Sequence, residues 1–256
     1  MSKLKPFYEN DSFILYKNDN KLVSKIVSEK SVDMIFADPP YFLSDGGITC
    51  KSGKMGSVNK GNWDKTIDIK KKIAYNRKWL KECKKVLKDS GTIWISGTFH
   101  NIYCVGVALE LEGFAILNNI TWQKPNPAPN LSCKTFTHST ETIIWAKKAG
   151  IKNNKYYFNY ELMKKINHNK QMKDVWLIGL PKKNEKQYGK HPTQKPLELM
   201  ERILLCSTRE NDLVLDPFNG SGTTGVASKK LNRRYIGFEI ETEFLNITIE
   251  RVKKLV

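Results

Sequence analysis

Long hydrophobic runs, paired cysteines and acidic side chains are scarce in this sequence of 256 residues. No apolar stretch approaches the ~18 residues that span a bilayer, and no signal-peptide core opens the chain. We therefore expect a soluble protein that stays in the compartment where it is made. The five cysteines form no C-x-x-C pair and are odd in number, which predicts reduced thiols and a cytoplasmic location.

Basic residues outnumber the acidic ones, since 43 Lys and Arg face 26 Asp and Glu and leave a net charge of +17. The excess is local: residues 42–90 carry +8 and residues 147–195 carry +10. Charge gathered in two blocks predicts two contacts with a polyanion such as nucleic acid, although a solvated lysine-rich face is the alternative. The second block also contains aromatic residues of the kind that stack on unpaired bases, namely Tyr156, Tyr157, Phe158, Tyr160, Trp176 and Tyr188.

Hydrophobic runs that alternate with helical periodicity predict an α/β fold, a doubly wound and mostly parallel sheet with an antiparallel hairpin. The predicted strands cover residues 31–37, 92–96, 114–123, 140–147, 212–216 and 235–238. The predicted helices cover residues 69–87, 100–112, 196–208 and 222–231. We expect one domain over residues 1–256, in which the irregular, basic segment 148–190 is an insertion.

The first motif with chemical content is Asp38-Pro39-Pro40-Tyr41, directly after a predicted strand. Each proline fixes φ and lacks an N–H, so the Asp38 carboxylate and the Pro39 carbonyl are presented as rigid acceptors. Tyr41 adds a flat face beside them. Two acceptors and a stacking plane suit a planar ring with an exocyclic amino group, although a plain turn with an aromatic lid has the same pattern.

The second motif is the glycine-rich run 216–225, between a predicted strand and a predicted helix. Glycines let the backbone approach a ligand, and the helix N-terminus offers free N–H groups. Its G-x-G-x-x-G spacing, with Glu239 further on, would also suit a nicotinamide dinucleotide. Asp216 would repel a pyrophosphate, however, so a cationic ligand such as S-adenosylmethionine fits better, with its ribose on Glu239.

Together the two motifs resemble those of amino-methylating DNA methyltransferases. The catalytic motif comes first and the glycine-rich motif last, which is the order of the permuted β class, and residues 191–196 (His-Pro-Thr-Gln-Lys-Pro) resemble that class's cofactor-side motif. Residues 119–130 and 137–142 look most like the DpnA-type second methyltransferases of GATC restriction systems. The resemblance covers nearly the whole chain and implies a Rossmann-like, S-adenosylmethionine-dependent methyltransferase fold.

The resemblance also implies roles for individual residues. Asp38 and the Pro39 carbonyl would accept hydrogen bonds from the target amino group, and Tyr41 would stack on the flipped base, with Pro40 completing the catalytic motif. The implied S-adenosylmethionine-binding residues are Asp19, Asn20, Asp38, His191, Thr193, Gln194, Asp216, Phe218, Gly220, Ser221, Gly222, Thr223 and Glu239. Capping a helix is the alternative role for Asp19. No metal site is expected, because the histidines and cysteines lack zinc-ligand spacing.

The implied reaction is methyl transfer from S-adenosylmethionine to the N6 amino group of a flipped adenine, at GATC sites in a restriction–modification system. Asp rather than Ser before Pro-Pro-Tyr favours adenine in this family. N4-cytosine methylation is the alternative reaction, and a non-catalytic nucleic-acid-binding protein that retains the fold is the alternative from another class. The third alternative is a nicotinamide-dependent oxidoreductase.

The implied partners are double-stranded DNA, single-stranded DNA, a second copy of the chain and a cognate restriction endonuclease, with the protein held at a prokaryotic nucleoid by DNA. Lysines in both basic blocks are the expected phosphate contacts: Lys51, Lys54, Lys60, Lys182, Lys183 and Lys186. Residues 42–63 are long for a connection within one domain, so we predict that they form a loop that closes over the flipped base.

Overall fold

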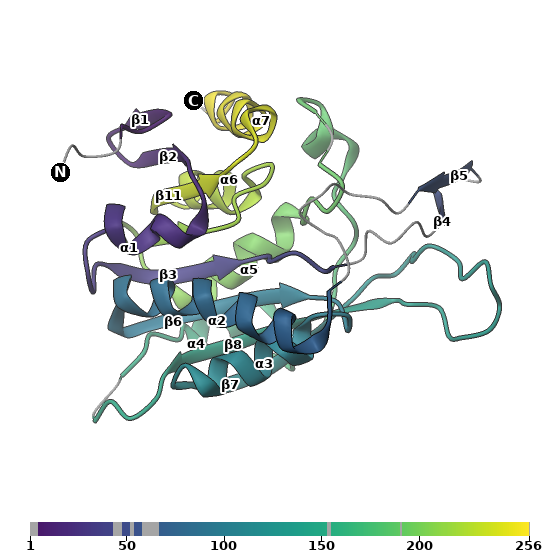
Figure 1. The fold of residues 1–256 in the computed structure, drawn as a ribbon, viewed down its shortest axis with the longest axis horizontal. Coiled ribbons are helices and arrows are strands. Elements are labelled where there is room, and N and C mark those ends of the chain that lie inside the picture. Colours follow the sequence, from purple (N-terminus) through teal and green to yellow (C-terminus); the bar gives the residue numbers. More distant parts are fainter. Residues whose placement is uncertain are drawn as a thin grey trace.

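The computed structural model describes residues 5–42, 48–51, 54–57, 67–152, 155–189 and 191–255. This part of the chain forms a nine-stranded sheet with helices on both faces (Figure 1). The strand order is β1-β2-β11-β10-β3-β6-β8-β7-β9. In chain order the strands are β1 Tyr8–Asn10, β2 Phe13–Lys17, β3 Val32–Ala37, β6 Leu87–Gly97, β7 Phe114–Gln123, β8 Thr140–Lys148, β9 Val175–Leu177, β10 Leu213–Asp216 and β11 Arg234–Glu239.

The helices divide between the two faces of this sheet. They are α1 Val23–Ile26, α2 Ile69–Val86, α3 Ile102–Leu111, α4 Tyr160–Ile166, α5 Leu197–Ser207, α6 Thr223–Lys230 and α7 Thr242–Lys253, with 3-10 turns η1 Asn20–Leu22 and η3 Lys183–Lys186. Because side chains alternate along a strand, β3 sends Met34 and Phe36 into the core beneath α5, α6 and α7 and sends Ile35 and Ala37 into the core beneath α1, α2 and α3. Burial on both faces explains why this strand is continuously apolar.

The pairing of the strands confirms the doubly wound, mostly parallel sheet. Strands β2, β11, β10, β3 and β6 run parallel, and β8 and β7 form the predicted antiparallel hairpin. Strand β3 lies directly beside β10, with Met34 opposite Val214 and Ile35 opposite Leu215. The two sequence motifs therefore follow neighbouring strands at the same edge of the sheet, where ligands bind in such folds.

The end of α2 differs from the sequence prediction. The helix stops at Val86 and β6 begins at once, so residues 88–91, which separate the predicted helix 69–87 from the predicted strand 92–96, lie inside the strand. There the register changes from Val32 opposite Leu87 to Met34 opposite Thr92, which is a bulge. Gly91 permits the close approach, since a Cβ at this position would lie 2.9 Å from the carbonyl oxygen of Asp33.

The basic segment 148–190 is more ordered than the sequence indicated. It contains α4, η3 and β9, and β9 extends the sheet by pairing in parallel with β7. Trp176, at the centre of β9, is 6% exposed and its ring lies 6.3 Å from that of Trp94. Trp176 is therefore a core residue and not the exposed aromatic residue that the composition of the segment suggested.

The predicted closing loop over residues 42–63 is described only in part. Its described backbone forms a hairpin of β4 Ile48–Lys51 and β5 Lys54–Ser57, with Lys51 opposite Lys54. The side chains of Lys51 and Lys54, and the whole of Lys60, lie outside the described residues. Among the described residues, no helix has both the length and the apolar character needed to cross a bilayer.

Candidate active site

The carboxyl ends of β2, β3, β10 and β11 enclose a cavity of about 290 Å³. Its walls include the catalytic motif residues Asp38, Pro39, Pro40 and Tyr41. They also include all but one of the predicted cofactor residues: Asp19, Asn20, Asp38, His191, Thr193, Gln194, Asp216, Phe218, Gly220, Ser221, Thr223 and Glu239. Motifs far apart in the sequence thus meet in one cavity, whose volume lies near the lower end of the roughly 300–1,000 Å³ typical of small-molecule sites.

Gly222 is the predicted cofactor residue that does not line the cavity. It caps α6 with φ at +75°, in the left-handed region that favours glycine. A Cβ at this position would lie 2.3 Å from Cγ2 of Thr248 on α7. Gly222 therefore allows α7 to pack closely against the start of α6, and it shapes the cavity from behind.

Two residues hold the glycine-rich turn in place. Glu239 accepts a hydrogen bond of 2.8 Å from the backbone N–H of Gly220, and its other oxygen accepts from the N–H groups of Ile240 and Glu241. Burial raises the pKa of the Glu239 carboxyl. From the opposite side the Arg251 guanidinium, buried on α7, donates to the carbonyl of Ser221. The sequence analysis did not single out Arg251, because nothing near it in the chain resembles a motif.

Asp216 occupies the end of β10 and is buried. It accepts hydrogen bonds from the backbone N–H of Phe218 at 2.9 Å and from the hydroxyl of Thr224 at 2.7 Å. Burial, and to a lesser extent the charges of Asp38 and Glu239, raise the pKa of Asp216 to about 7. A buried carboxyl of this kind favours a cationic ligand, which would offset the cost of its ionisation.

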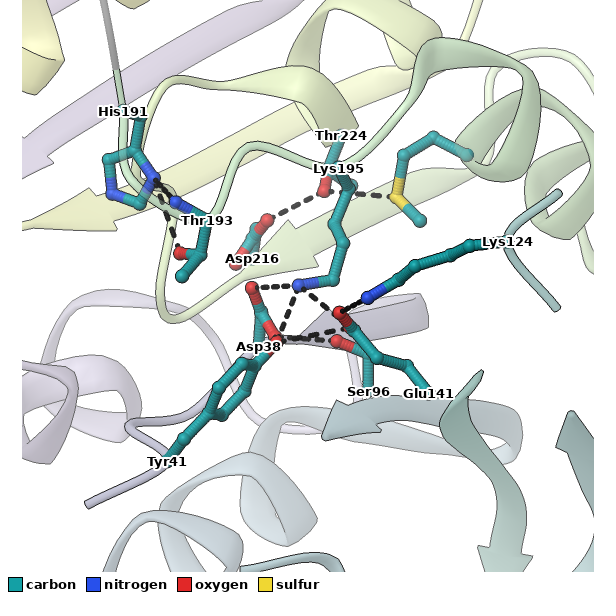
Figure 2. A network of polar contacts seen from close by, with 11 residues as sticks. Asp38, Tyr41, Ser96, Lys124, Glu141, His191, Thr193, Lys195, Asp216 and Thr224 are labelled. Carbon is teal, nitrogen blue, oxygen red and sulfur yellow. Dashed lines mark hydrogen bonds and ion pairs between the residues drawn. The ribbon is translucent and has the colours of Figure 1, made fainter. Parts of the chain in front are cut away.

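The Asp38 carboxylate lies at the centre of a polar network (Figure 2). Its Oδ1 accepts from the Tyr41 hydroxyl at 2.7 Å and from the Ser96 hydroxyl at 2.5 Å. Its Oδ2 accepts from Lys195 Nζ at 2.6 Å. The Pro40 carbonyl accepts from Asn101 at 2.8 Å, whereas the Pro39 carbonyl accepts no hydrogen bond from the described residues. Both Asp38 and Pro39 face the cavity and can serve as acceptors there.

Four residues of this network were not among the predicted site residues: Ser96, Lys124, Glu141 and Lys195. A signal for two of them existed, because Lys195 belongs to the motif at 191–196 and Glu141 to the segment 137–142. Pattern alone could not reveal that both approach Asp38, since they come from separate elements.

Tyr41 is only 5% exposed, and its hydroxyl takes part in this same network. Lys195 Nζ donates to it at 2.6 Å, and it donates to Asp38. Burial, followed by the nearby carboxylates of Asp38 and Glu141, raises the pKa of Tyr41 well above its ordinary value. The phenol therefore stays protonated, and Tyr41 is one of the residues that line the cavity.

The walls of the cavity fit S-adenosylmethionine. Gln194 Oε1 is buried without a hydrogen-bond partner among the described residues, so an acceptor is open to a ligand. Gly220, at φ +50°, leaves a space that a Cβ would fill, 3.1 Å from His191 Nε2. The carboxyl groups of Asp216 and Glu239 match a sulfonium cation and a ribose. Asp19, although it caps η1 by accepting from the N–H of Lys21, also borders the cavity.

The three predicted lysines that are described lie on the surface beside this cavity. Lys182, Lys183 and Lys186 are exposed around η3. Glu185 anchors the turn, because it accepts from the backbone N–H groups of Lys182 and Leu197 and its carbonyl accepts from Gln194, a cavity residue. These lysines therefore stand on a turn fixed to the cavity wall.

A doubly wound sheet with these carboxyl groups around a cavity for S-adenosylmethionine defines a methyltransferase of the Rossmann-like class. The model of the family described as DNA methylase matches residues 32–250. The chain is 59% identical to the type II methyltransferase M2.LlaDCHI of Lactococcus lactis subsp. cremoris, over 98% of this chain and 93% of that protein. It is also 59% identical to M2.DpnII of Streptococcus pneumoniae, over 97% and 92%.

A solved structure, the complex of M1.HpyAVI with S-adenosylmethionine, superposes with a TM-score of 0.69 at 29% identity. The match covers 94% of this chain and 98% of that one. The chain belongs to the DNA methylase family. It is an S-adenosylmethionine-dependent DNA methyltransferase, as the resemblance implied, and its substrate is DNA.

Proposed function

We propose that this enzyme methylates the N6 amino group of an adenine flipped out of double-stranded DNA, at GATC sites in a restriction–modification system. The observation that carries the proposal is the Asp38 carboxylate, held by Tyr41 and Ser96 at the mouth of a cavity that fits S-adenosylmethionine. The 59% identity to M2.DpnII supports the restriction context and, with the resemblance of residues 119–130, the GATC site.

Methylation of an exocyclic amino group first requires a nucleophilic nitrogen. The amino lone pair is delocalised into the purine ring, and hydrogen bonds from both N–H groups hold it in a reactive geometry. Asp38 and the Pro39 carbonyl supply the two acceptors, and the rigid Pro39-Pro40 backbone fixes their separation. Tyr41 supports the flipped ring by stacking on it.

S-adenosylmethionine supplies an electrophilic methyl group on a sulfonium when bound. We assign its positioning to two groups of residues. One group lies after β10 and at the end of β11 and comprises Asp216, Phe218, Gly220, Ser221, Thr223 and Glu239, with Gly222 packing behind them. The other comprises Asp19 and Asn20 after β2 and His191, Thr193 and Gln194 before α5. Holding the methyl donor in line with the amino nitrogen accounts for much of the expected acceleration.

Incubation with labelled S-adenosylmethionine and duplex DNA, followed by nucleoside analysis, tests this function. N6-methyladenine confined to duplexes that contain GATC is the expected product. N4-methylcytosine would establish the alternative reaction, and an absence of label would leave a nucleic-acid-binding protein with this fold. Parallel reactions with single-stranded GATC oligonucleotides test the further proposal that single strands are methylated.

We assign DNA contacts to the basic segment 148–190 and to the lysines on η3, and we propose that residues 42–63 close over the flipped base. Lys51, Lys54 and Lys60 would then reach phosphates near the target. The support is the charge of these segments and the position of η3 beside the cavity. Because DNA is the substrate, we place the enzyme in a prokaryotic cytoplasm, held at the nucleoid by DNA, with a cognate endonuclease of the same specificity.

A homodimer is also proposed, on a separate observation. Four apolar side chains spaced four residues apart along and before α3 are exposed: Phe99, Tyr103, Val107 and Leu111. A stripe of this kind is typical of a surface that a partner covers. Sedimentation of the wild type and of Val107→Glu tests it: the wild type should sediment as a dimer and the variant as a monomer. A wild type that sediments as a monomer, as the variant does, would refute the homodimer.

A further inference from the structure

The acceptor assigned to the target amino group is already engaged in the structure. Lys195 places its Nζ 2.6 Å from Asp38 Oδ2 and 2.6 Å from the Tyr41 hydroxyl oxygen. Its side chain is 4% exposed, so water does not satisfy the ammonium. An amino group that donates to Asp38 Oδ2 would therefore share this oxygen with Lys195, which already occupies one of its acceptor sites.

A second carboxylate lies on the other side of this ammonium (Figure 2). Glu141, on β8, has its Oε2 3.5 Å from Lys195 Nζ. Its Oε1 accepts a hydrogen bond of 2.6 Å from Lys124 Nζ, which fixes the carboxylate in this position. Lys195 thus has one carboxylate at short hydrogen-bond distance, directly after β3, and another at a longer distance, on β8.

We propose that Lys195 holds the Asp38 carboxylate in its orientation until the target base arrives, and that Glu141 then receives the ammonium and so frees Asp38 Oδ2 for the amino group. In this proposal Lys195 and Glu141 are positioning residues, because they act on the reaction through Asp38. The inference rests on the proposed role of Asp38 as amino-group acceptor. The exchange needs a rotation of the Lys195 side chain only, and no bond or proton is transferred.

The balance of charge explains why two carboxylates serve one ammonium. Two anions, Asp38 and Glu141, face two cations, Lys195 and Lys124, so the charges of these four residues balance. Burial alone would lower the pKa of Lys195, but the two carboxylates outweigh it and raise that pKa. An ammonium that left Asp38 with no second carboxylate beside it would be buried without an opposite charge, which is strongly unfavourable.

A double-mutant cycle on a GATC duplex tests the exchange. Glu141→Gln keeps the shape of the side chain but removes its charge, so the ammonium should stay on Asp38. We expect kcat to fall by about 10- to 100-fold, the size of a charged hydrogen bond, while the affinity for S-adenosylmethionine is kept. In a Lys195→Met background, Glu141→Gln should cost nothing further, because no ammonium remains to be received.

The split between kcat and KM separates this role from a purely structural ion pair. An ammonium that stays on Asp38 hinders the reacting amino group, so Glu141→Gln should lower kcat and leave the KM for S-adenosylmethionine at its wild-type value. An ion pair that only stabilises the fold would lower the Tm without this selective loss of kcat. If Lys195→Met proves too unstable to assay, Lys195→Gln, which keeps hydrogen-bonding capacity, replaces it in the same cycle.

Lys148→Met is the matched control, because Lys148 is also buried and pairs with an acid, Asp89, away from the cavity. It should reduce the Tm and leave kcat in place. Retained methylation in Asp38→Ala would refute the proposed function itself. Lost methylation in Asp38→Ala, together with an unchanged kcat in Glu141→Gln or additive effects of Glu141→Gln and Lys195→Met, would refute only the exchange.

Discussion

Arg251 on the C-terminal helix donates a hydrogen bond of 2.6 Å to the carbonyl of Ser221 in the glycine-rich turn. The same nitrogen lies 3.0 Å from the Thr223 hydroxyl oxygen, so one guanidinium joins α7 to the cofactor wall. Burial lowers the pKa of Arg251 to about 10, and the group therefore remains charged at neutral pH. The shape of the turn depends on this contact as well as on its glycines.

Arg251→Met should loosen the turn while preserving most of the packed volume. We expect a loss of about 2 kcal/mol in the free energy of unfolding, because a buried carbonyl loses a charged donor. The affinity for S-adenosylmethionine should weaken as well, as calorimetric titration would show. Wild-type cofactor affinity in a destabilised variant would mean that Arg251 supports the fold alone.

Asp38→Ala should reduce kcat by about 100- to 1,000-fold, the loss seen when one preorganised polar contact to the reacting group is removed. Cofactor affinity should persist, since the glycine-rich turn is untouched. Asp68→Ala, which removes an exposed cap of α2, is the control and should retain wild-type kcat. Substantial methylation by the Asp38 variant would overturn its assignment.

Tyr41→Phe and Tyr41→Ala separate the ring from the hydroxyl. The phenylalanine variant keeps the stacking plane, and Ser96 still donates to Asp38 Oδ1, so the loss of activity should be mild. The alanine variant removes the plane on which the base stacks and should be severely impaired. Equal losses in the two variants, measured by steady-state methylation, would show that the hydroxyl matters more than the ring.

Asp216 predicts a pH dependence of cofactor binding. Its pKa of about 7 leaves the carboxyl largely neutral below that pH and ionised above it. A cationic ligand is attracted by the ionised form, so affinity should rise as the pH passes through 7 and then level off. Asp216→Asn cannot ionise, and the rise should be absent from its titration curve. The same rise in both proteins would trace it to the ligand or to another group.

The lysines around η3 predict a salt dependence. Each lysine that neutralises a phosphate adds to the slope of log affinity against log salt, by about 0.9 per contact on duplex DNA. Replacing Lys182, Lys183 and Lys186 by Gln should therefore flatten the slope. The same number of changes at Lys25, Lys230 and Lys253, which are exposed and lie outside both basic blocks, should leave it steeper. Identical slopes in all three proteins would place the DNA elsewhere.

The sequence allowed the main strands and the cavity walls to be predicted, because both depend on local patterns. Apolar runs closed by Asp38 or Asp216 are readable along the chain, and strand adjacency then brings the two acids together. Strand β9 was missed because three residues in a polar segment give no periodic signal. The network of Lys195 and Glu141 was missed because its partners come from separate elements and meet only in space.

Gly222 shows a different limit. The motif predicts a glycine at this position, but two different requirements lead to the same residue. Either a cofactor or a neighbouring helix can approach the backbone so closely that no side chain fits. Only the position of Thr248 on α7, more than twenty residues later, distinguishes them. A motif can therefore identify a residue correctly without indicating which neighbour it accommodates.

The central position of β3 has a consequence for the making of the protein. One edge of β3 pairs with β6, which is synthesised soon after β3. The other edge stays unpaired until β10 is synthesised. The hydrogen bond from the Leu213 N–H to the Asp33 carboxylate joins residues 180 positions apart in the chain. At about 5–20 residues per second, a ribosome needs roughly 10 to 40 s to supply that partner. During this interval an apolar strand edge stands open to other nascent chains, so slower translation or removal of chaperones should increase aggregation of the growing chain.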